Sequence, residues 1–159
     1  MSLNELRNKA YRNAVTHGFH DKELSNEHCF CLIISELMEA VEADRKGKHA
    51  DRESFKSSYE DEEPHDDVNF KYCFEKYIKD TISDELSEAV IRLLDLAGLR
   101  GISLELANGD IDDCIEDMAE ACKDETFTES IYSISTLPVR YDGRFDFSIT
   151  VNDMILSIF

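Results

Sequence analysis

Apolar side chains recur along most of this chain at the three- and four-residue spacing that is typical of amphipathic helices. The spacing predicts a helix over residues 3–16, a second from Ser25 to about Lys46, and a helical stretch from Val68 to the turn at Arg100 and Gly101. Further helices are expected over 103–123 and 128–137. The last stretch, RFDFSITVNDMILSIF, alternates like a strand but also fits a helix, which we favour. We therefore predict an all-α fold in a single domain, residues 1–159.

Residues 48–67 interrupt this pattern. They contain eight acidic residues between Asp51 and Asp67, few apolar side chains and Pro64. Such a composition does not bury enough apolar surface to hold a packed structure. We interpret the segment as a mobile acidic insertion that lies away from any functional site.

Charge and composition narrow the partners that the chain can have. The net charge of −18 argues against binding to a nucleic-acid backbone, whereas a free nucleotide remains compatible if cations bridge the two negative partners. No apolar run approaches the roughly 18–20 residues that cross a bilayer, and the first residues lack a signal-peptide core. The five cysteines form no C-x-x-C pair. We expect a soluble protein of the cytoplasm with no membrane partner.

Two glutamates of the second predicted helix occupy an unusual position. Helical geometry places Glu36 between Cys29 and Leu32, on a helix so apolar that we expect protein to surround it. A carboxylate there is disfavoured unless it is paired, hydrogen-bonded or bound to a metal. Glu39 projects from the same side one turn later, so both side chains can reach one cation, whereas Glu42 opens the solvent side.

The carboxylates of the later helix have a more ordinary context. Glu85, Glu88, Arg92 and Asp95 form a stripe beside the apolar face. Periodicity alone favours a solvated face with a Glu88–Arg92 ion pair at i,i+4. We interpret His20, in the break after the first helix, as a local loop residue. The sequence contains no Walker loop, dinucleotide fingerprint or serine nucleophile elbow.

Taken together, two segments resemble the MazG-like all-α nucleoside triphosphate pyrophosphohydrolases. They are ISELMEAVEADRKGK (34–48) and SDELSEAVIRLLDLAGLRGI (83–102). The signature of that family is Glu-x-x-Glu on one helix and Glu-x-x-Asp on the next. Glu36 and Glu39 match the first pair, and Glu85 and Glu88 match the second. Glu88 replaces the usual aspartate, and the connection between the motifs is longer than usual.

The resemblance implies an antiparallel helical bundle that hydrolyses a nucleoside triphosphate (NTP or dNTP) to a monophosphate and pyrophosphate. It implies that the four glutamates are both the catalytic residues and the ligands of Mg²⁺, with Mn²⁺ as the alternative. Substrate phosphates would be contacted by Arg92, Lys46 and Lys48. It further implies a homodimer or homotetramer, for which we expect exposed apolar surface on Leu93, Leu96 and Leu99. Two alternatives share the fold: a non-catalytic acidic interaction protein and a structural cation-binding bundle.

Overall fold

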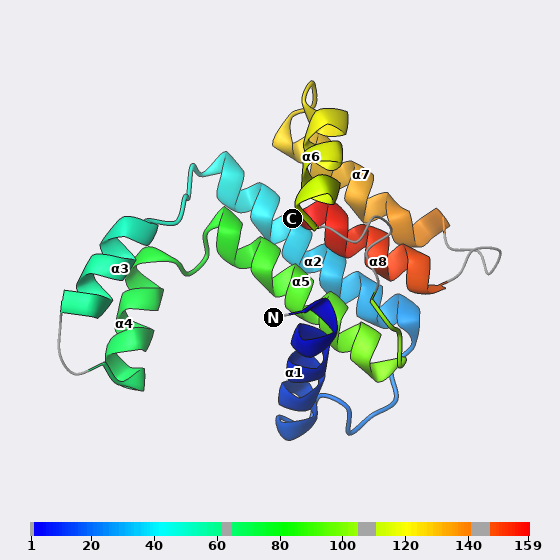
Figure 1. Ribbon diagram of the computed structural model, residues 1–159, viewed down its shortest axis with the longest axis horizontal. Helices are drawn as coiled ribbons and strands as arrows, with labels where there is room; N and C mark the ends of the chain where they lie inside the picture. The colour runs from blue at the N-terminus through cyan, green and yellow to red at the C-terminus, as the bar shows by residue number, and fades with distance from the viewer. Residues whose placement is uncertain (1, 62–64, 105–110, 141–146) are drawn as a thin grey trace.

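The computed structural model describes residues 2–61, 65–104, 111–140 and 147–159, and within these ranges the chain forms eight helices and no strand (Figure 1). The helices are α1 (Leu3–Thr16), α2 (Asn26–Arg45), α3 (Arg52–Asp61), α4 (Asp67–Tyr77), α5 (Ile82–Leu99), α6 (Ile111–Cys122), α7 (Phe127–Arg140) and α8 (Phe147–Ile158). The prediction of an all-α fold is confirmed. The C-terminal stretch is helical, as favoured above, and α7 continues one turn beyond its predicted end, through Pro138.

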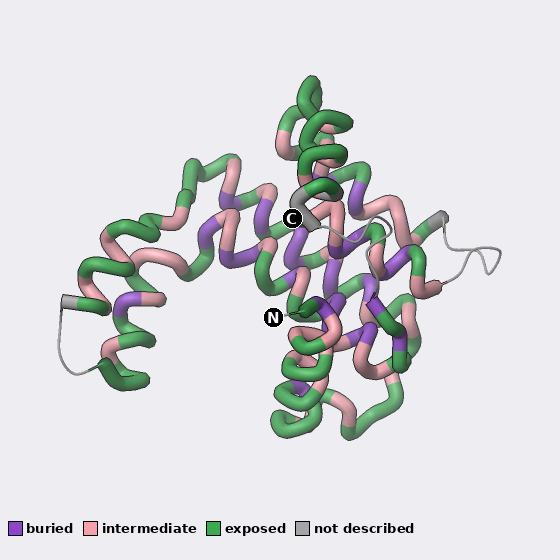
Figure 2. Tube along the Cα trace, in the orientation of Figure 1, coloured by how far each residue is buried: buried purple, intermediate pink, exposed green. Residues whose placement is uncertain are grey.

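An antiparallel pair formed by α2 and α5 lies at the centre of the molecule (Figure 1). α1 packs on α5, while α7 and α8 pack on the other side of the pair. Figure 2 shows that buried residues gather where these helices face one another. The largest fully buried side chains of this core come from α2, α5 and α8: Ile33, Leu37, Leu93, Leu96, Val151, Met154 and Ile155.

The helix α2 begins and ends close to where its capping residues predict. The Ser25 side chain accepts a hydrogen bond from the backbone N–H of His28, which satisfies one unpaired donor of the first turn. At the other end, Lys46 closes the helix and Gly47 adopts a φ of 64°, a conformation that glycine takes without strain. These local signals position the helix that carries Glu36 and Glu39.

Much of the acidic segment is helical, with α3 over Arg52–Asp61 and the start of α4 at Asp67, although its composition predicted no packed structure there. Asp51 accepts a hydrogen bond from the N–H of Ser54 at the start of α3. Phe55 and Tyr59 of α3 then pack edge-on against Phe70 of α4, with ring centroids 5.7 and 5.6 Å apart. These aromatic contacts form a small apolar interface between the two helices, which could not be predicted from the acidic composition of the segment. Residues 62–64 of the predicted insertion lie outside the described ranges.

The pair α3–α4 extends from one end of the α2–α5 pair, at the left of Figure 1. Two backbone hydrogen bonds connect the two segments that join this pair to α2 and α5. The N–H of Asp51 donates to the Tyr77 carbonyl at 3.0 Å, and that of Ile82 donates to the Lys48 carbonyl at 3.1 Å. α4 and α5 are separate helices although their apolar pattern is continuous. The chain turns at Asp80, with a φ of 57°, and Thr81 caps α5.

The surfaces of α2 and α5 differ from expectation in two ways. The protein does not surround α2, because Leu32 and Met38 are 38% and 44% exposed. On α5, Leu93 and Leu96 are buried in the core and Leu99 is half-buried, so the expectation of exposed leucines there is wrong. Within the described ranges, no helix has both the length and the apolar composition that spanning a bilayer demands.

Candidate metal centre

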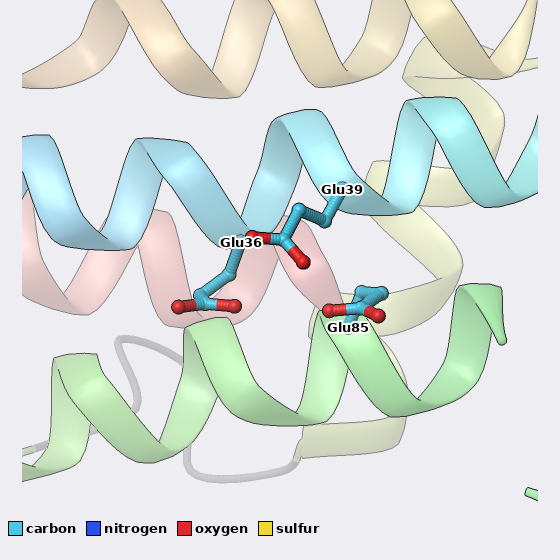
Figure 3. Close-up of side chains that lie close together, drawn as sticks. All are labelled: Glu36, Glu39 and Glu85. Carbon is cyan, nitrogen blue, oxygen red and sulfur yellow. The ribbon is translucent and has the colours of Figure 1, made fainter. Parts of the chain in front are cut away.

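Three of the four glutamates converge between α2 and α5. Glu36 and Glu39 project from α2 toward α5, where Glu85 lies opposite them (Figure 3). Each contributes a carboxylate oxygen to a group in which all oxygens lie within 4.8 Å of one another. The i,i+3 spacing on α2 and the antiparallel run of α5 produce this arrangement. We call Glu36, Glu39 and Glu85 the glutamate cluster.

The cluster lies half inside the protein. Glu36 and Glu85 are buried, with 5% and 7% of their surface exposed, whereas Glu39 is exposed. The side chain of Glu42, one turn beyond Glu39, is 51% exposed and pairs with Lys46. The predicted contrast between a protein-facing Glu36 and a solvent-facing Glu42 is confirmed.

Arg92 provides a positive partner that periodicity did not reveal. Its Nη2 lies 2.6 Å from Oε1 of Glu36, so the ion pair crosses between the two helices. The expected Glu88–Arg92 pair along α5 is replaced by this contact. A charge-assisted bond of this length satisfies one oxygen of a buried carboxylate.

Negative charge remains in excess at the cluster. Burial, followed by the charges of Glu39, Glu88, Asp84 and Glu36, raises the pKa of Glu85 to about 7. Burial and the Glu36 charge likewise raise the pKa of Glu88 above its ordinary value, although Arg92 lowers it in part. The site therefore favours either a proton or a bound cation.

Glu88 is not among the converging carboxylates. It is exposed, one turn further along α5 than Glu85. Its electrostatic coupling to Glu36 nevertheless places it beside the cluster. Asp84, which the sequence pattern did not single out, is 8% exposed and accepts a hydrogen bond from the N–H of Asp80 at 2.9 Å. The helix-start pattern Thr81-x-x-Asp84 was the available signal.

The donor set of the cluster fits a hard divalent cation. It offers carboxylate oxygens, the ligands that Mg²⁺ prefers, and neither imidazole nor thiolate. Two oxygens on opposite sides of one Mg²⁺ lie about 4 Å apart, since each metal–oxygen distance is about 2.0–2.1 Å. The upper limit of 4.8 Å between the oxygens of the cluster is close to this span.

The two lysines predicted to contact phosphate lie elsewhere. Lys46 Nζ is 2.9 Å from a carboxylate oxygen of Glu42, and Lys48 Nζ is 4.0 Å from one of Asp80. Both lysines are exposed beyond the C-terminal end of α2. Of the three predicted cations, Arg92 is the one paired with the cluster.

A pocket of about 400 Å³ adjoins the cluster and is lined by residues of α1, α2, α5 and the α1–α2 connection. Glu88 and Arg92 belong to its lining. His20 also lines it and bonds through Nε2 to Oδ1 of Asp95 at 2.8 Å, across 75 residues of sequence. The interpretation of His20 as a purely local loop residue is wrong, because its partner comes from α5.

Comparison of the chain with models of known protein families, with curated proteins and with solved structures found no match. The MazG-like resemblance therefore remains a prediction that depends on the two quoted segments. The geometry of the glutamate cluster and of the adjoining pocket is the independent basis for the function proposed next.

Proposed function

We propose that this protein hydrolyses a nucleoside triphosphate to a nucleoside monophosphate and pyrophosphate with the help of Mg²⁺. The observation that carries the proposal is the convergence of Glu36, Glu39 and Glu85 from two antiparallel helices, next to a pocket that Arg92, the partner of Glu36, helps to line. Buried carboxylates in excess over positive charge suit cation binding, and a pocket beside them suits an organic ligand.

Each residue of the site has a role in this scheme. The glutamate cluster holds the cation, and Glu88, which lies outside the converging set, lines the pocket beside it. When bound, Mg²⁺ or Mn²⁺ neutralises phosphate charge and lowers the pKa of a water molecule. Arg92 lies between Glu36 and the pocket, where it can donate to a phosphate oxygen. Lys46 and Lys48 keep their outlying ion pairs and have no direct role in this scheme.

The reaction requires one bond exchange. The oxygen of a water molecule attacks the α-phosphorus, and the bond from that phosphorus to the bridging oxygen of the β-phosphate breaks. Pyrophosphate leaves with the electron pair of that bond. The proton of the attacking water passes to a nearby carboxylate.

A non-catalytic interaction protein and a structural cation-binding bundle would share this fold, so turnover must separate them. The pocket favours the enzyme, because neither alternative needs a cavity of about 400 Å³ beside the carboxylates.

The test is incubation of the protein with each common NTP and dNTP in Mg²⁺, in Mn²⁺ and in EDTA. We expect pyrophosphate, rather than inorganic phosphate, in either metal and no release in EDTA. In water enriched in oxygen-18, the label should enter the monophosphate, since water attacks the α-phosphorus. Release of inorganic phosphate alone, or no turnover of any nucleotide, would overturn the proposal.

A further inference from the structure

The pocket beside the glutamate cluster has two chemically different regions. At one side lie Glu88 and Arg92, which also border the cluster. The remaining wall is mostly apolar and includes Phe19, Leu24 and Ile91. A volume of about 400 Å³ falls within the range of small-ligand sites. A ligand whose anionic end reaches the cluster therefore extends its uncharged part along apolar side chains.

One polar pair interrupts the apolar wall. His20 and Asp95 have only 15% and 23% of their side chains exposed, and their contact is 2.8 Å long. When Asp95 is ionised, its carboxylate only accepts hydrogen bonds, so Nε2 of His20 is then the donor of this contact. This bond fixes Oδ1 of Asp95, and the Tyr11 ring, with its centroid 5.4 Å from that of His20, packs beside the imidazole. The pair thus presents a positioned acceptor to the pocket.

The charges that line the pocket indicate what this acceptor can bind. Glu88 and Asp95 are acidic, and Arg92 is already paired with Glu36. A second anionic group in the pocket would meet repulsion, whereas a neutral ring that donates N–H groups would be attracted. Cytosine and adenine have flat apolar faces and carry an exocyclic amino group at C4 and C6, respectively, where uracil, hypoxanthine and guanine carry an oxo group. A base with an oxo group at that position would face Asp95 with a lone pair.

We propose that this pocket holds the base and sugar of the nucleotide and that Asp95, positioned by His20, selects bases carrying an exocyclic amino group. The inference deepens the proposed function and rests on it, because the cluster would hold the triphosphate of the same molecule. At the position of the amino group, an oxo base turns a lone pair toward Asp95, so that contact becomes repulsive in a partly buried site. Sites of this kind discriminate strongly against a ligand that lacks the expected hydrogen-bonding group.

The test uses product-like monophosphates, so that binding is measured without turnover. dCMP is compared with dUMP, and dAMP with dIMP, by calorimetry on the full chain. Within each pair the amino group is exchanged for an oxo group. We expect the amino form to bind about tenfold more tightly or better in the pair whose ring size fits, a difference that corresponds to about 1.4 kcal/mol. In NMR spectra of the full chain, which has five histidines, the ring resonances of His20 should shift when the monophosphate that carries the amino group is added.

The variant Asp95→Asn should reduce the preference for the amino over the oxo monophosphate to less than about threefold, because the asparagine amide can donate a hydrogen bond to the oxo group as well as accept one from the amino group. Asp124→Asn, at an exposed position outside the pocket, should keep the full preference. Comparing the binding of amino and oxo monophosphates to the wild-type chain tests the inference even if Asp95→Asn fails to fold. Equal binding of amino and oxo forms, unmoved His20 resonances, or no binding of any monophosphate at millimolar concentration would overturn the inference.

The two proposals fail in different ways. An amino preference that depends on Asp95, together with no pyrophosphate release from any triphosphate, would uphold the pocket assignment and refute the proposed hydrolysis. Pyrophosphate release at equal kcat/KM from amino and oxo substrates would uphold the hydrolysis and refute the selection by Asp95.

Discussion

Glu36 and Glu42 lie on the same helix but in opposite environments. Glu36 is 5% exposed and bonded to Arg92, whereas half of the Glu42 side chain is in solvent. Helical periodicity was enough to predict this difference, because the neighbours of Glu36 on the helix surface are apolar. It did not predict Arg92 as the partner, since a contact between helices depends on how α2 and α5 are rotated against each other.

The shifted pKa of Glu85 gives a prediction for folding stability. In the native state the pKa is raised from 4.5 to about 7, so the native protein binds more protons than the unfolded chain between these values. Stability in EDTA should therefore fall as pH rises from about 4.5 to 7, with a total loss of about 3 kcal/mol from this group. Urea unfolding at pH 5 and pH 8 measures the loss.

The variant Glu85→Gln isolates this contribution. It removes the ionisable group, so the difference in unfolding free energy between pH 5 and pH 8 should shrink by about 2 kcal/mol relative to wild type. Saturating Mg²⁺ should suppress the same pH dependence in wild type, because a bound cation favours the ionised carboxylate. An unchanged pH dependence in the variant would show that Glu85 titrates normally.

At the scale of elements, α1 and α5 approach each other closely at Gly98. A Cβ atom placed there would lie 2.5 Å from Cβ of Tyr11, an atom that cannot move without its backbone. In an exposed helix, Gly→Ala stabilises by roughly 0.5–1 kcal/mol. Here Gly98→Ala should instead destabilise by about 1–3 kcal/mol and weaken ligand binding in the adjacent pocket. Thermal unfolding with a raised midpoint would contradict this close packing.

The α3–α4 pair is expected to be dispensable for the site. Its two helices pack mainly on each other, and its ends meet at the hydrogen bond between Asp51 and Tyr77. Replacing residues 52–76 by two glycines should leave cooperative unfolding and the stabilisation by Mg²⁺ within error of wild type. Circular dichroism and thermal melts with and without Mg²⁺ measure both properties. Loss of the Mg²⁺ effect would mean that the pair contributes to the cation site.

The helix boundaries that could be predicted are those with local signals. Ser25 and Gly47 delimit α2 through hydrogen bonding and backbone conformation that depend on neighbouring residues alone. The helix α3 could not be predicted in this way, because its aromatic residues are stabilised by Phe70 of another helix. The pairing of His20 with Asp95 has the same origin, since the two residues meet only in the folded chain.

At the scale of the whole molecule, the surface of the central helix pair remains partly apolar. Met38 of α2 is 44% exposed and lies outside the pocket lining. We expect this side chain, rather than the buried Leu93 and Leu96, to contribute to a homodimer or homotetramer. Sedimentation at micromolar concentration should give an oligomer, and Met38→Glu should shift it toward monomer. A wild-type monomer would contradict the proposed assembly.

The central claim is that the glutamate cluster binds the cation needed for hydrolysis, and the most direct test compares two substitutions on α2. Glu36→Gln keeps the size and one acceptor for Arg92 but removes a cluster charge, whereas Glu42→Gln changes a solvent-exposed carboxylate. Pyrophosphate release in Mg²⁺ is measured for both variants with the preferred triphosphate. We predict that Glu36→Gln lowers kcat/KM by about 100-fold or more and that Glu42→Gln leaves it within about twofold. Equal rates for the two variants would contradict the account.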